Sequence, residues 1–386
     1  MSPSIAPHKP QKQDIVAPVF ILGVESSCDE TAASVLRRDP DGSTHILSSI
    51  IASQDEYHAK FGGVVPEIAA RAHMSIIDAI IDQAVTEAGV DYSDLSAVAA
   101  TSGPGLIGGV ITGLLAAKGL CLSLDIPLIA VNHLEGHALS PRLSGPCAFP
   151  YLLLLVSGGH TQLLSVKGLG DYERLGSTVD DAAGEAFDKT AKVMGLGFPG
   201  GPNVERVAAG GDPKSVKLPR PYWGQDHANF SFAGLKTAVA RAWRSSDKSE
   251  QDAANVAASF QATVCEVLSE RTGRAMDMFT KDIMSTNEVE PSDTPHRFVV
   301  AGGVAANKAI RGALEHLCEA KGFSLNAPPM VYCTDNAAMI ALAGLEHFIQ
   351  GNISDLSAKA RPRWPLDSAA AKSDPASGSG KKGPKS

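Results

Sequence analysis

Two histidines one helical turn apart are the residues of this sequence best placed to do chemistry. The segment Asn132-His133-Leu134-Glu135-Gly136-His137 follows an apolar run at 128–131 that is typical of a buried strand. If Asn132 caps a helix there, His133 and His137 lie on the same face of that helix. Two imidazoles on one face are an arrangement that binds a divalent metal ion. The spacing therefore predicts a metal site at the start of this helix.

A third protein ligand is usual in metal sites of this kind, and we assign it to Asp335. This residue lies in Cys333-Thr334-Asp335-Asn336, at a predicted strand-to-helix junction where side chains meet across a cleft. The alternative is a pair of histidines on a solvated helix surface, which is the commoner outcome for an arbitrary pair at this spacing. The position directly after a buried strand, among other loops with site-like composition, favours the metal.

A zinc protease is the obvious rival class. Its motif is H-E-x-x-H, in which the glutamate directly after the first histidine activates water. Here Glu135 comes two residues after His133, about 200° around the helix, and so points away from the histidine face. The spacing therefore disfavours peptide hydrolysis by that mechanism.

Two glycine-rich loops each follow a predicted strand. They are Leu155-Val156-Ser157-Gly158-Gly159-His160 and Gly302-Gly303-Val304-Ala305-Ala306-Asn307. Glycines let backbone N–H groups turn toward an anion, and a following helix adds its dipole. One Gly-Gly pair is as often a simple tight turn. Two such pairs, together with a polar hairpin tip at 25–30, favour a nucleotide held between duplicated lobes, although neither a Walker A motif nor GxGxxG is present.

A third glycine-containing segment holds Asp188 and Gly201. Asp188 can accept hydrogen bonds from a ribose or an amide, and Gly201 can let a ligand approach the backbone. From spacing alone, an ion pair of Asp188 with Lys189 or Lys192 is the better-supported interpretation. Cys28 beside Asp29 is disfavoured as a nucleophile because no base lies near it in the sequence.

The order of predicted elements indicates an α/β protein with an internal duplication. Strand–polar tip–strand hairpins are expected at 19–36 and at 151–166, further strands at 95–100 and 297–301, and helices at 73–88, from the SGPGLIGG loop to 124, and from about 306. We expect a disordered arm at 1–17, a first lobe at 18–132, a second lobe at 133–361 and a disordered tail at 362–386. The final helix, 334–350, is expected to pack back on the first lobe.

Composition limits the class of protein further. The chain has 386 residues, of which 44% are hydrophobic, and we find no apolar run of about 18 residues without charge. Six cysteines without a CxxC pair suggest a reducing compartment. The net charge of −8 argues against a broadly basic nucleic-acid-binding surface. The cations Lys217, Arg220, Lys236, Arg241 and Arg244 form either a local basic patch or, more commonly for such a run, solvated surface charge.

Eight ordered motifs carry a family resemblance that covers residues 19–363. They are VESSCDET, SGPGLIGG, NHLEGHALS, LLVSGGHTQL, GEAFDKTAKVMGLGFPGGP, FSFAGLKTA, VVAGGVAANKAIR and YCTDNAAMIA. Together they closely resemble the catalytic subunit of the bacterial tRNA N6-adenosine threonylcarbamoyltransferases, a family formerly described as O-sialoglycoprotein endopeptidases. The resemblance implies the two-lobed actin-like ATPase (ASKHA) fold, with duplicated βαβ lobes.

The resemblance also implies a set of site residues. One divalent metal, with Fe²⁺ favoured over Zn²⁺, is expected on His133, His137 and Asp335. Substrate, either threonylcarbamoyl-AMP or ATP in the cleft, is expected on Leu155, Val156, Ser157, Gly158, Gly159, Asp188, Gly201 and Asn307. No residue is assigned as a covalent nucleophile.

The implied reaction moves a threonylcarbamoyl group from threonylcarbamoyl-AMP to N6 of the adenosine 3′ of the anticodon, in tRNAs reading ANN codons, and releases AMP. The implied partners are tRNA, a smaller paralogous actin-fold subunit and a small ATPase, with no membrane, in the cytoplasm of a bacterium rather than in a mitochondrion. The alternatives are a nucleotide-dependent switch or binding module and a kinase of the same fold. A kinase would hold magnesium with carboxylates and water and has no use for two imidazoles.

Overall fold

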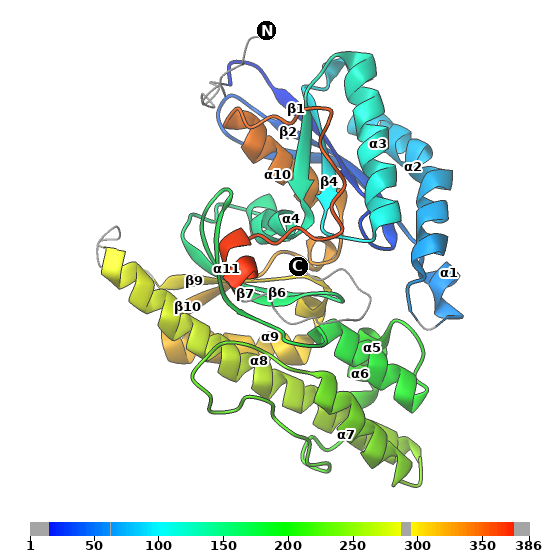
Figure 1. The fold of residues 1–386 in the computed structure, drawn as a ribbon, viewed down its shortest axis with the longest axis vertical. Coiled ribbons are helices and arrows are strands. Elements are labelled where there is room, and N and C mark those ends of the chain that lie inside the picture. The colour runs from blue at the N-terminus through cyan, green and yellow to red at the C-terminus, as the bar shows by residue number, and fades with distance from the viewer. Residues whose placement is uncertain (1–14, 62, 287–294, 374–386) are drawn as a thin grey trace.

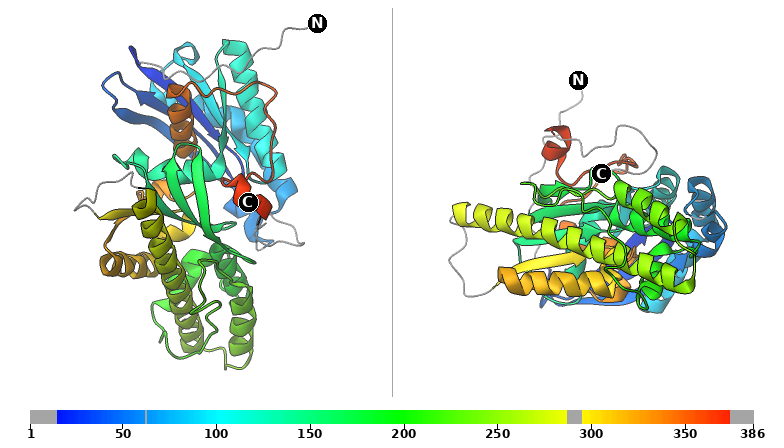
Figure 2. Two further views of the ribbon diagram at one scale, coloured as in Figure 1. Left: turned by 60° about the vertical axis from the view of Figure 1, so that its left-hand side comes forward. Right: turned by 90° about the horizontal axis from the view of Figure 1, so that it is seen from below.

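A computed structural model describes residues 15–61, 63–286 and 295–373. Figure 1 shows two lobes stacked along the long axis, with the short helix α4 between them. Each lobe is built around a five-stranded mixed sheet. The two further views in Figure 2 show that helices cover these sheets.

The first lobe contains the sheet with strand order β3-β2-β1-β4-β5. Strands β1 and β2 form the expected hairpin, and β1 also pairs in parallel with β4. The elements of this lobe are β1 (Val19–Glu25), β2 (Glu30–Arg38), β3 (Thr44–Ser53), α1 (Asp55–Ala59), α2 (Pro66–Ala88), β4 (Ala97–Gly103), α3 (Ile107–Leu124) and β5 (Leu128–Asn132). Helix α4 (His133–Leu139) follows β5 and lies between the lobes.

The second lobe repeats this arrangement with the strand order β10-β9-β6-β7-β8. Its strands are β6 (Tyr151–Val156), β7 (Thr161–Gly168), β8 (Asp171–Ser177), β9 (His296–Ala301) and β10 (Phe323–Asn326). As in the first lobe, a hairpin leads into a third antiparallel strand, and the first strand pairs in parallel with the fourth. The predicted duplication is therefore confirmed, although the third strand of each lobe, β3 and β8, was not expected.

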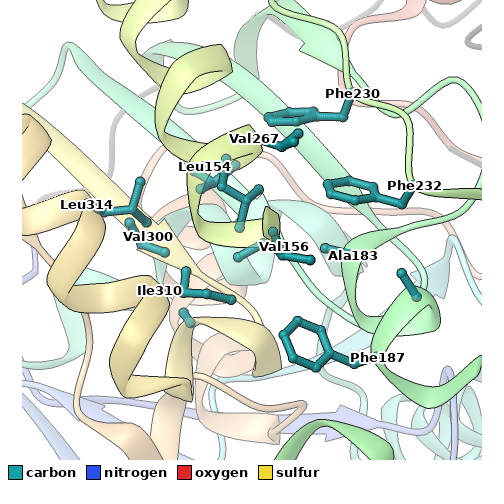
Figure 3. Packing of buried hydrophobic residues seen from close by; sticks show 14 of the residues in the cluster. Leu154, Val156, Ala183, Phe187, Phe230, Phe232, Val267, Val300, Ile310 and Leu314 are labelled. Carbon is teal, nitrogen blue, oxygen red and sulfur yellow. The ribbon is translucent and has the colours of Figure 1, made fainter. Parts of the chain in front are cut away.

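Strand β6 is buried on both faces, which explains its uninterrupted run of apolar residues. Leu154 and Val156 point into the core shown in Figure 3, where they meet side chains from the helices and from the chain that precedes α7. Those labelled include Phe187, Phe230, Phe232, Ile310 and Leu314. The helices of this lobe are α5 (Ala183–Met194), α6 (Gly200–Ala208), α7 (Ala233–Arg244), α8 (Glu250–Thr286) and α9 (Lys308–Lys321).

Helix α3 is more apolar than the sequence analysis expected. Of the described helices it alone passes a test of length and composition for crossing a membrane. One of its faces, with Leu114, Ala117 and Cys121, is part of the core of the first lobe. The core helices of globular proteins pass the same test, and α3 has that role here. Its opposite face exposes Ile107, Ile111, Leu115 and Leu122.

After β10 the chain returns to the first lobe. Helix α10 (Ala337–Ile349) packs its small and branched side chains against the first sheet, including Ile21, Ala99 and Val131. Ser354 then donates its backbone N–H to Leu128, and Arg361 donates its own to Ser102. Both α10 and the segment that follows it from Ser354 therefore lie on the first lobe.

The expected disordered tail from 362 onward is wrong for residues 362–373. Asn132 donates a side-chain hydrogen bond to the Trp364 carbonyl, and Asp367 accepts one from the backbone of Arg174. Asp367 also caps the short helix α11 (Ser368–Ser373) by accepting from Ala370. Composition misled here because it does not record the hydrogen bonds that hold this segment. The expectations for 1–14 and 374–386 lie outside the described residues.

Candidate metal centre

The helix that carries the two histidines begins as the sequence predicted. Asn132 ends β5, and its side-chain oxygen accepts a hydrogen bond from the backbone N–H of Leu134 at 2.9 Å. Such a cap satisfies one of the free N–H groups of the first helical turn. The cap fixes the start of α4, so that His133 and His137 leave the helix from the same face.

Three ligand-type side chains meet at this point. The Nε2 atoms of His137 and His133 lie 2.9 Å and 3.6 Å from Oδ1 of Asp335. The two imidazole rings are 4.7 Å apart between centroids and nearly perpendicular. Within the part of the chain that the structure describes, these three residues form a cluster whose ligand atoms all lie within 4.8 Å of one another. This spacing suits a common metal ion.

Close packing of α4 on α10 brings the histidines to Asp335. Asn336 caps α10 by accepting from the backbone of Met339, and this fixes Asp335 directly before the helix. Gly136 faces α10, where a Cβ atom would lie 2.8 Å from the Ile340 side chain. The absence of a side chain at 136 therefore allows the two helices to approach.

A second layer of buried groups orients His133. Its Nδ1 lies 2.9 Å from Oε2 of Glu25, at the end of β1, and 3.1 Å from Oγ of Ser27. Thr101 donates a hydrogen bond to the same Glu25 oxygen at 2.6 Å. A metal on Nε2 of His133 would require the remaining ring proton on Nδ1, where Glu25 can accept it. Metal-binding histidines commonly have such a carboxylate partner.

The electrostatics of the cluster keep its carboxylates charged. Burial by itself would raise the pKa of Asp335, but the charge of His133 and the hydrogen bond with His137 hold that pKa below its ordinary value. Burial likewise opposes ionisation of Glu25, and His133 again lowers the pKa of this carboxyl. Burial lowers the pKa of His133, but Asp335 and Glu25 outweigh it and raise the value to about 9. The pocket is therefore built to hold positive charge.

Two buried nitrogen atoms near the cluster have no hydrogen-bond partner among the described residues. They are Nδ1 of His137 and Nε2 of His160, the histidine that ends the first glycine loop. Burial, and then the charges of His133 and His137, lower the pKa of His160 to about 3, which keeps it neutral. The His₂Asp donor set and the contact of Glu25 with His133 fit a divalent metal.

Glu135 lies away from the histidine face, as its position in the sequence predicted. Its carboxylate accepts a hydrogen bond from Tyr172 at 2.8 Å and lies 2.9 Å from Nε2 of His347 on α10. Glu135 therefore ties α4 to the surrounding elements, and it is not placed to activate water at the cluster.

The first glycine loop lies at the carboxyl end of β6. The side chains of Leu155 and Val156 are buried in cores on opposite faces of the sheet, so only their backbone groups can face a ligand. Ser157 and His160 close the turn through a backbone hydrogen bond of 2.8 Å. Gly158 and Gly159 are exposed at its tip. The second glycine loop lies beside this turn, because Gly302 packs against the Val156 carbonyl.

The remaining predicted substrate residues lie on neighbouring helices of the second lobe. The backbone N–H of Gly184, at the start of α5, bonds to the Ser157 carbonyl at 3.2 Å. Asp188 lies further along α5, accepts from the backbone of Gly200 at 2.8 Å, and has a pKa that burial raises. Gly201 opens α6 and has free space on the side where a Cβ atom would lie.

Asp188 and Asn307 make contacts within the protein that the sequence analysis did not predict. Lys189 pairs with Asp181 and Glu185 rather than with Asp188, so the expected surface ion pair is not the one observed. Asn307 caps α9 through its oxygen and donates to Gln261 through its nitrogen, which gives this residue a structural task besides any contact with substrate.

Cys28 lies on the first hairpin and is poorly suited to nucleophilic attack. Burial, and then the carboxylates of Asp29 and Glu30, raise the pKa of its thiol well above the ordinary value. The thiolate is the reactive form of cysteine. The observation agrees with the weak case that the sequence made for this nucleophile.

The basic stretch at 217–244 lies far from the cluster. Arg220 pairs with Glu266 and stacks on Trp223, and the other cations of the second half of this stretch are on α7. Figure 1 shows α7 at the far end of the second lobe from α4. A nucleic acid acceptor that reaches the cluster must therefore be bound by other residues as well.

The fold and the site together define a class: a two-lobed α/β protein of the actin-like ATPase type with a His₂Asp cluster between its lobes. Comparison with solved structures supports the fold. HypF from T. kodakarensis, at 14% identity, has a TM-score of 0.56 over 89% of this chain and 50% of that one. A full-length HypF with bound phosphate and nucleotide has a TM-score of 0.50 over 89% of this chain and 56% of that one.

Sequence comparison identifies the family. The family model described as TsaD, tRNA N6-adenosine threonylcarbamoyltransferase, matches residues 45–342. Proteins of that name are 60% identical in Maricaulis maris, over 99% of both chains, and 57% identical in Caulobacter vibrioides, over 97% of this chain and 99% of the other. The chain belongs to the tRNA N6-adenosine threonylcarbamoyltransferase family. It is a tRNA-modifying transferase, and the resemblance stated from the sequence motifs is confirmed.

Proposed function

We propose that the chain transfers a threonylcarbamoyl group from threonylcarbamoyl-AMP to N6 of the adenosine 3′ of the anticodon, in tRNAs reading ANN codons. The observation that carries the mechanism is the convergence of His133, His137 and Asp335 beside the glycine loop of β6. We infer that these three residues hold one divalent metal, with Fe²⁺ first and Zn²⁺ second. A bound metal supplies Lewis-acid stabilisation for negative charge on the acyl phosphate.

The reaction needs no covalent protein nucleophile. The donor is a mixed anhydride, so the N6 amine attacks the carbamoyl carbon, a C–N bond forms, and the bond from that carbon to the phosphate oxygen breaks. AMP leaves with the electron pair, and the amine loses a proton. The need is for positive electrostatics where charge develops and for positioning of the two reactants.

Residues of the second lobe meet these needs. Gly158 and Gly159 are exposed residues whose backbone N–H groups can hold a phosphate or a carboxylate. Asp188 can accept from the ribose of AMP, and Gly201 leaves space for the nucleotide beside α6. Neutral His160 lies between the loop and the cluster and offers one unpaired ring nitrogen.

The donor set argues against the other readings of this fold. A kinase or a nucleotide switch needs oxygen ligands for magnesium, whereas two imidazole nitrogens face the cluster here. The Glu135 contacts leave a protease without its water-activating carboxylate.

Replacing the two histidines tests the proposal. We expect His133→Ala with His137→Ala to lose bound metal and tRNA modification together while the fold survives, because α4 keeps its cap and its packing. The measurements are elemental analysis of protein purified without oxygen, threonine transfer to unmodified tRNA with partner proteins present, and circular dichroism. His347→Ala is the control, since it removes a histidine bound to Glu135 rather than to Asp335. Full modification by metal-free protein would refute the metal assignment.

We further propose that a smaller paralogous actin-fold subunit docks on α3, and that a small ATPase assists the complex. Ile107, Ile111 and Leu115 repeat every four residues and are 42–59% exposed. They line a shallow groove with the chain at 357–360. A paralogue of the first lobe would bring an equivalent helix to pack against this stripe. Six unpaired cysteines also fit our expectation of a reducing bacterial cytoplasm.

A further inference from the structure

Residues 354–370 form a segment, here called the strap, that contacts both lobes. This connection is separate from the place where the chain first passes from the first lobe to the second. Its first half lies on the first lobe, where Ser102 donates its side-chain O–H to the Lys359 carbonyl and its own carbonyl accepts from Arg361. Gly105 donates its backbone N–H to the Pro362 carbonyl. Most hydrogen bonds of this half use backbone atoms of the strap, and Ala358 and Ala360 pack against the core of the first lobe.

The second half of the strap reaches the second lobe. The Trp364 carbonyl accepts from the side chain of Asn132, the residue next to His133. Arg174 on β8 then binds the strap twice, through its backbone N–H to Asp367 and through its guanidinium to the Ala370 carbonyl. Figure 1 shows this path running from beside β4 and α3 down to α11 near β7.

The path of the strap brings it to the edge of the site. Ser102 and Gly103 end β4 and Asn132 ends β5, so these anchors lie at the same sheet edge as Glu25 at the end of β1. Glu25 contacts His133 directly. The strap therefore follows the border of the cluster, and it is fixed there by its backbone.

The backbone of the strap forms hydrogen bonds to the two lobes, and its cationic side chains point to solvent. Lys359, Arg361 and Arg363 lie within five residues, all three are exposed, and none forms an ion pair with a described carboxylate. The Arg361 guanidinium stacks 4.3 Å from the Trp364 ring, which is half-buried. Exposed arginines beside an aromatic ring are a combination suited to RNA phosphates and bases.

The acceptor of this family is a tRNA, yet the chain carries a net charge of −8. Binding a polyanion therefore requires a local concentration of unpaired cations near the reacting centre. We propose that the strap is a tRNA-docking surface, with Arg361 and Arg363 contacting phosphates of the anticodon arm while the target adenosine enters the cleft. The inference rests on tRNA being the acceptor and does not depend on which metal the cluster holds.

A paired comparison of arginine variants tests the strap. Arg361→Ala with Arg363→Ala, in the full chain with its partner proteins, is expected to raise the Kd for an unmodified tRNA transcript about tenfold. The slope of log Kd against log salt should fall by up to about two, one for each lost phosphate contact. Metal content and thermal stability should match the parent, since both side chains point to solvent.

The matched variant is Arg241→Ala with Arg244→Ala, which removes the same charge from α7 at the far end of the second lobe. The proposal requires the strap variant to weaken tRNA binding clearly more than this one. Equal or greater weakening by the α7 variant would overturn it. It would also be overturned if tRNA affinity stayed at the parent value while a partner protein dissociated, because the strap would then be a protein-docking surface.

A second strap variant keeps the Arg361–Trp364 stack and so separates the loss of charge from the loss of this stack. Arg363→Ala alone leaves that stack in place and should still raise the Kd for tRNA, with a fall of about one in the slope of log Kd against log salt. A contrary result is weaker tRNA binding and loss of metal in the Arg361→Ala, Arg363→Ala variant, with neither change in the second variant. That result would show that the stack supports the cluster and would contradict docking. Loss of metal in the double histidine variant with tRNA affinity kept would leave the strap proposal standing.

Discussion

Glu25 and Glu135 are both buried carboxylates 2.9 Å from a histidine nitrogen, yet their surroundings give them different roles. Glu25 holds His133, whose other ring nitrogen faces Asp335. Glu135 holds His347 and Tyr172, neither of which lies in the cluster. The role of each buried carboxylate therefore depends on whether the second ring nitrogen of its histidine faces the cluster.

This difference predicts the effect of Glu25→Gln. The amide keeps the shape of the side chain but loses the charge that orients and polarises His133, so metal affinity should fall about 10- to 100-fold. Competition with a metal-binding dye measures the affinity directly, without an activity assay. Glu135→Gln is the matched control and should cost stability while leaving metal affinity within about twofold. Similar losses of affinity in both variants would contradict a specific role for Glu25.

At the scale of elements, the position of α10 sets the geometry of the cluster. It lies on the first sheet although it follows the second in sequence, and it brings Asp335 to α4. Gly23 on β1 makes this contact close, because a Cβ atom there would lie 2.4 Å from the Ala337 carbonyl and 2.7 Å from the Ala341 nitrogen. Both are backbone atoms of α10, which cannot rotate away.

Gly23→Ala should therefore destabilise the protein by about 1–3 kcal/mol through overpacking. Gly119→Ala on α3 is the control, since open space surrounds the position of its Cβ atom. Replacing a glycine by alanine in an exposed helix interior should stabilise it by about 0.5–1 kcal/mol. Denaturant unfolding of the metal-free proteins gives both values. A Gly23→Ala protein as stable as the parent would show that α10 packs less closely than described.

At the scale of the whole molecule, the two lobes differ in what they leave uncovered. The second lobe buries its helices around a large apolar core (Figure 3), whereas the first lobe leaves the α3 stripe facing solvent. An exposed apolar stripe on an otherwise acidic protein is suited to a permanent partner.

Ile111→Asp with Leu115→Asp should abolish co-purification of the smaller paralogous subunit, because two charges would be buried in an apolar contact. The change is expected to leave the chain folded and its metal bound, since both residues are exposed. Met278→Asp on α8 is the control: like Ile111, Met278 is 42% exposed on a helix. Retention of the partner by the double variant would exclude α3 as the docking helix.

Much of this protein was predictable from sequence because the deciding forces act locally. The two hairpins follow from apolar runs around polar tips, and the alignment of His133 with His137 follows from a capped helix of known pitch. The off-face position of Glu135 follows from the same pitch. The family resemblance then added the reaction and the tRNA acceptor, which no local pattern specifies.

Other features were decided only by tertiary structure. Glu25 meets His133 across 108 residues and Asp335 meets His137 across 198, and these separations carry no periodic signal. Residues 362–370 of the strap were expected to belong to a disordered tail, because composition does not record the hydrogen bonds that hold them. The sequence by itself determined which side chains share a helical face. Only packing of distant segments decided which carboxylate orients His133 and where the cations of the strap lie.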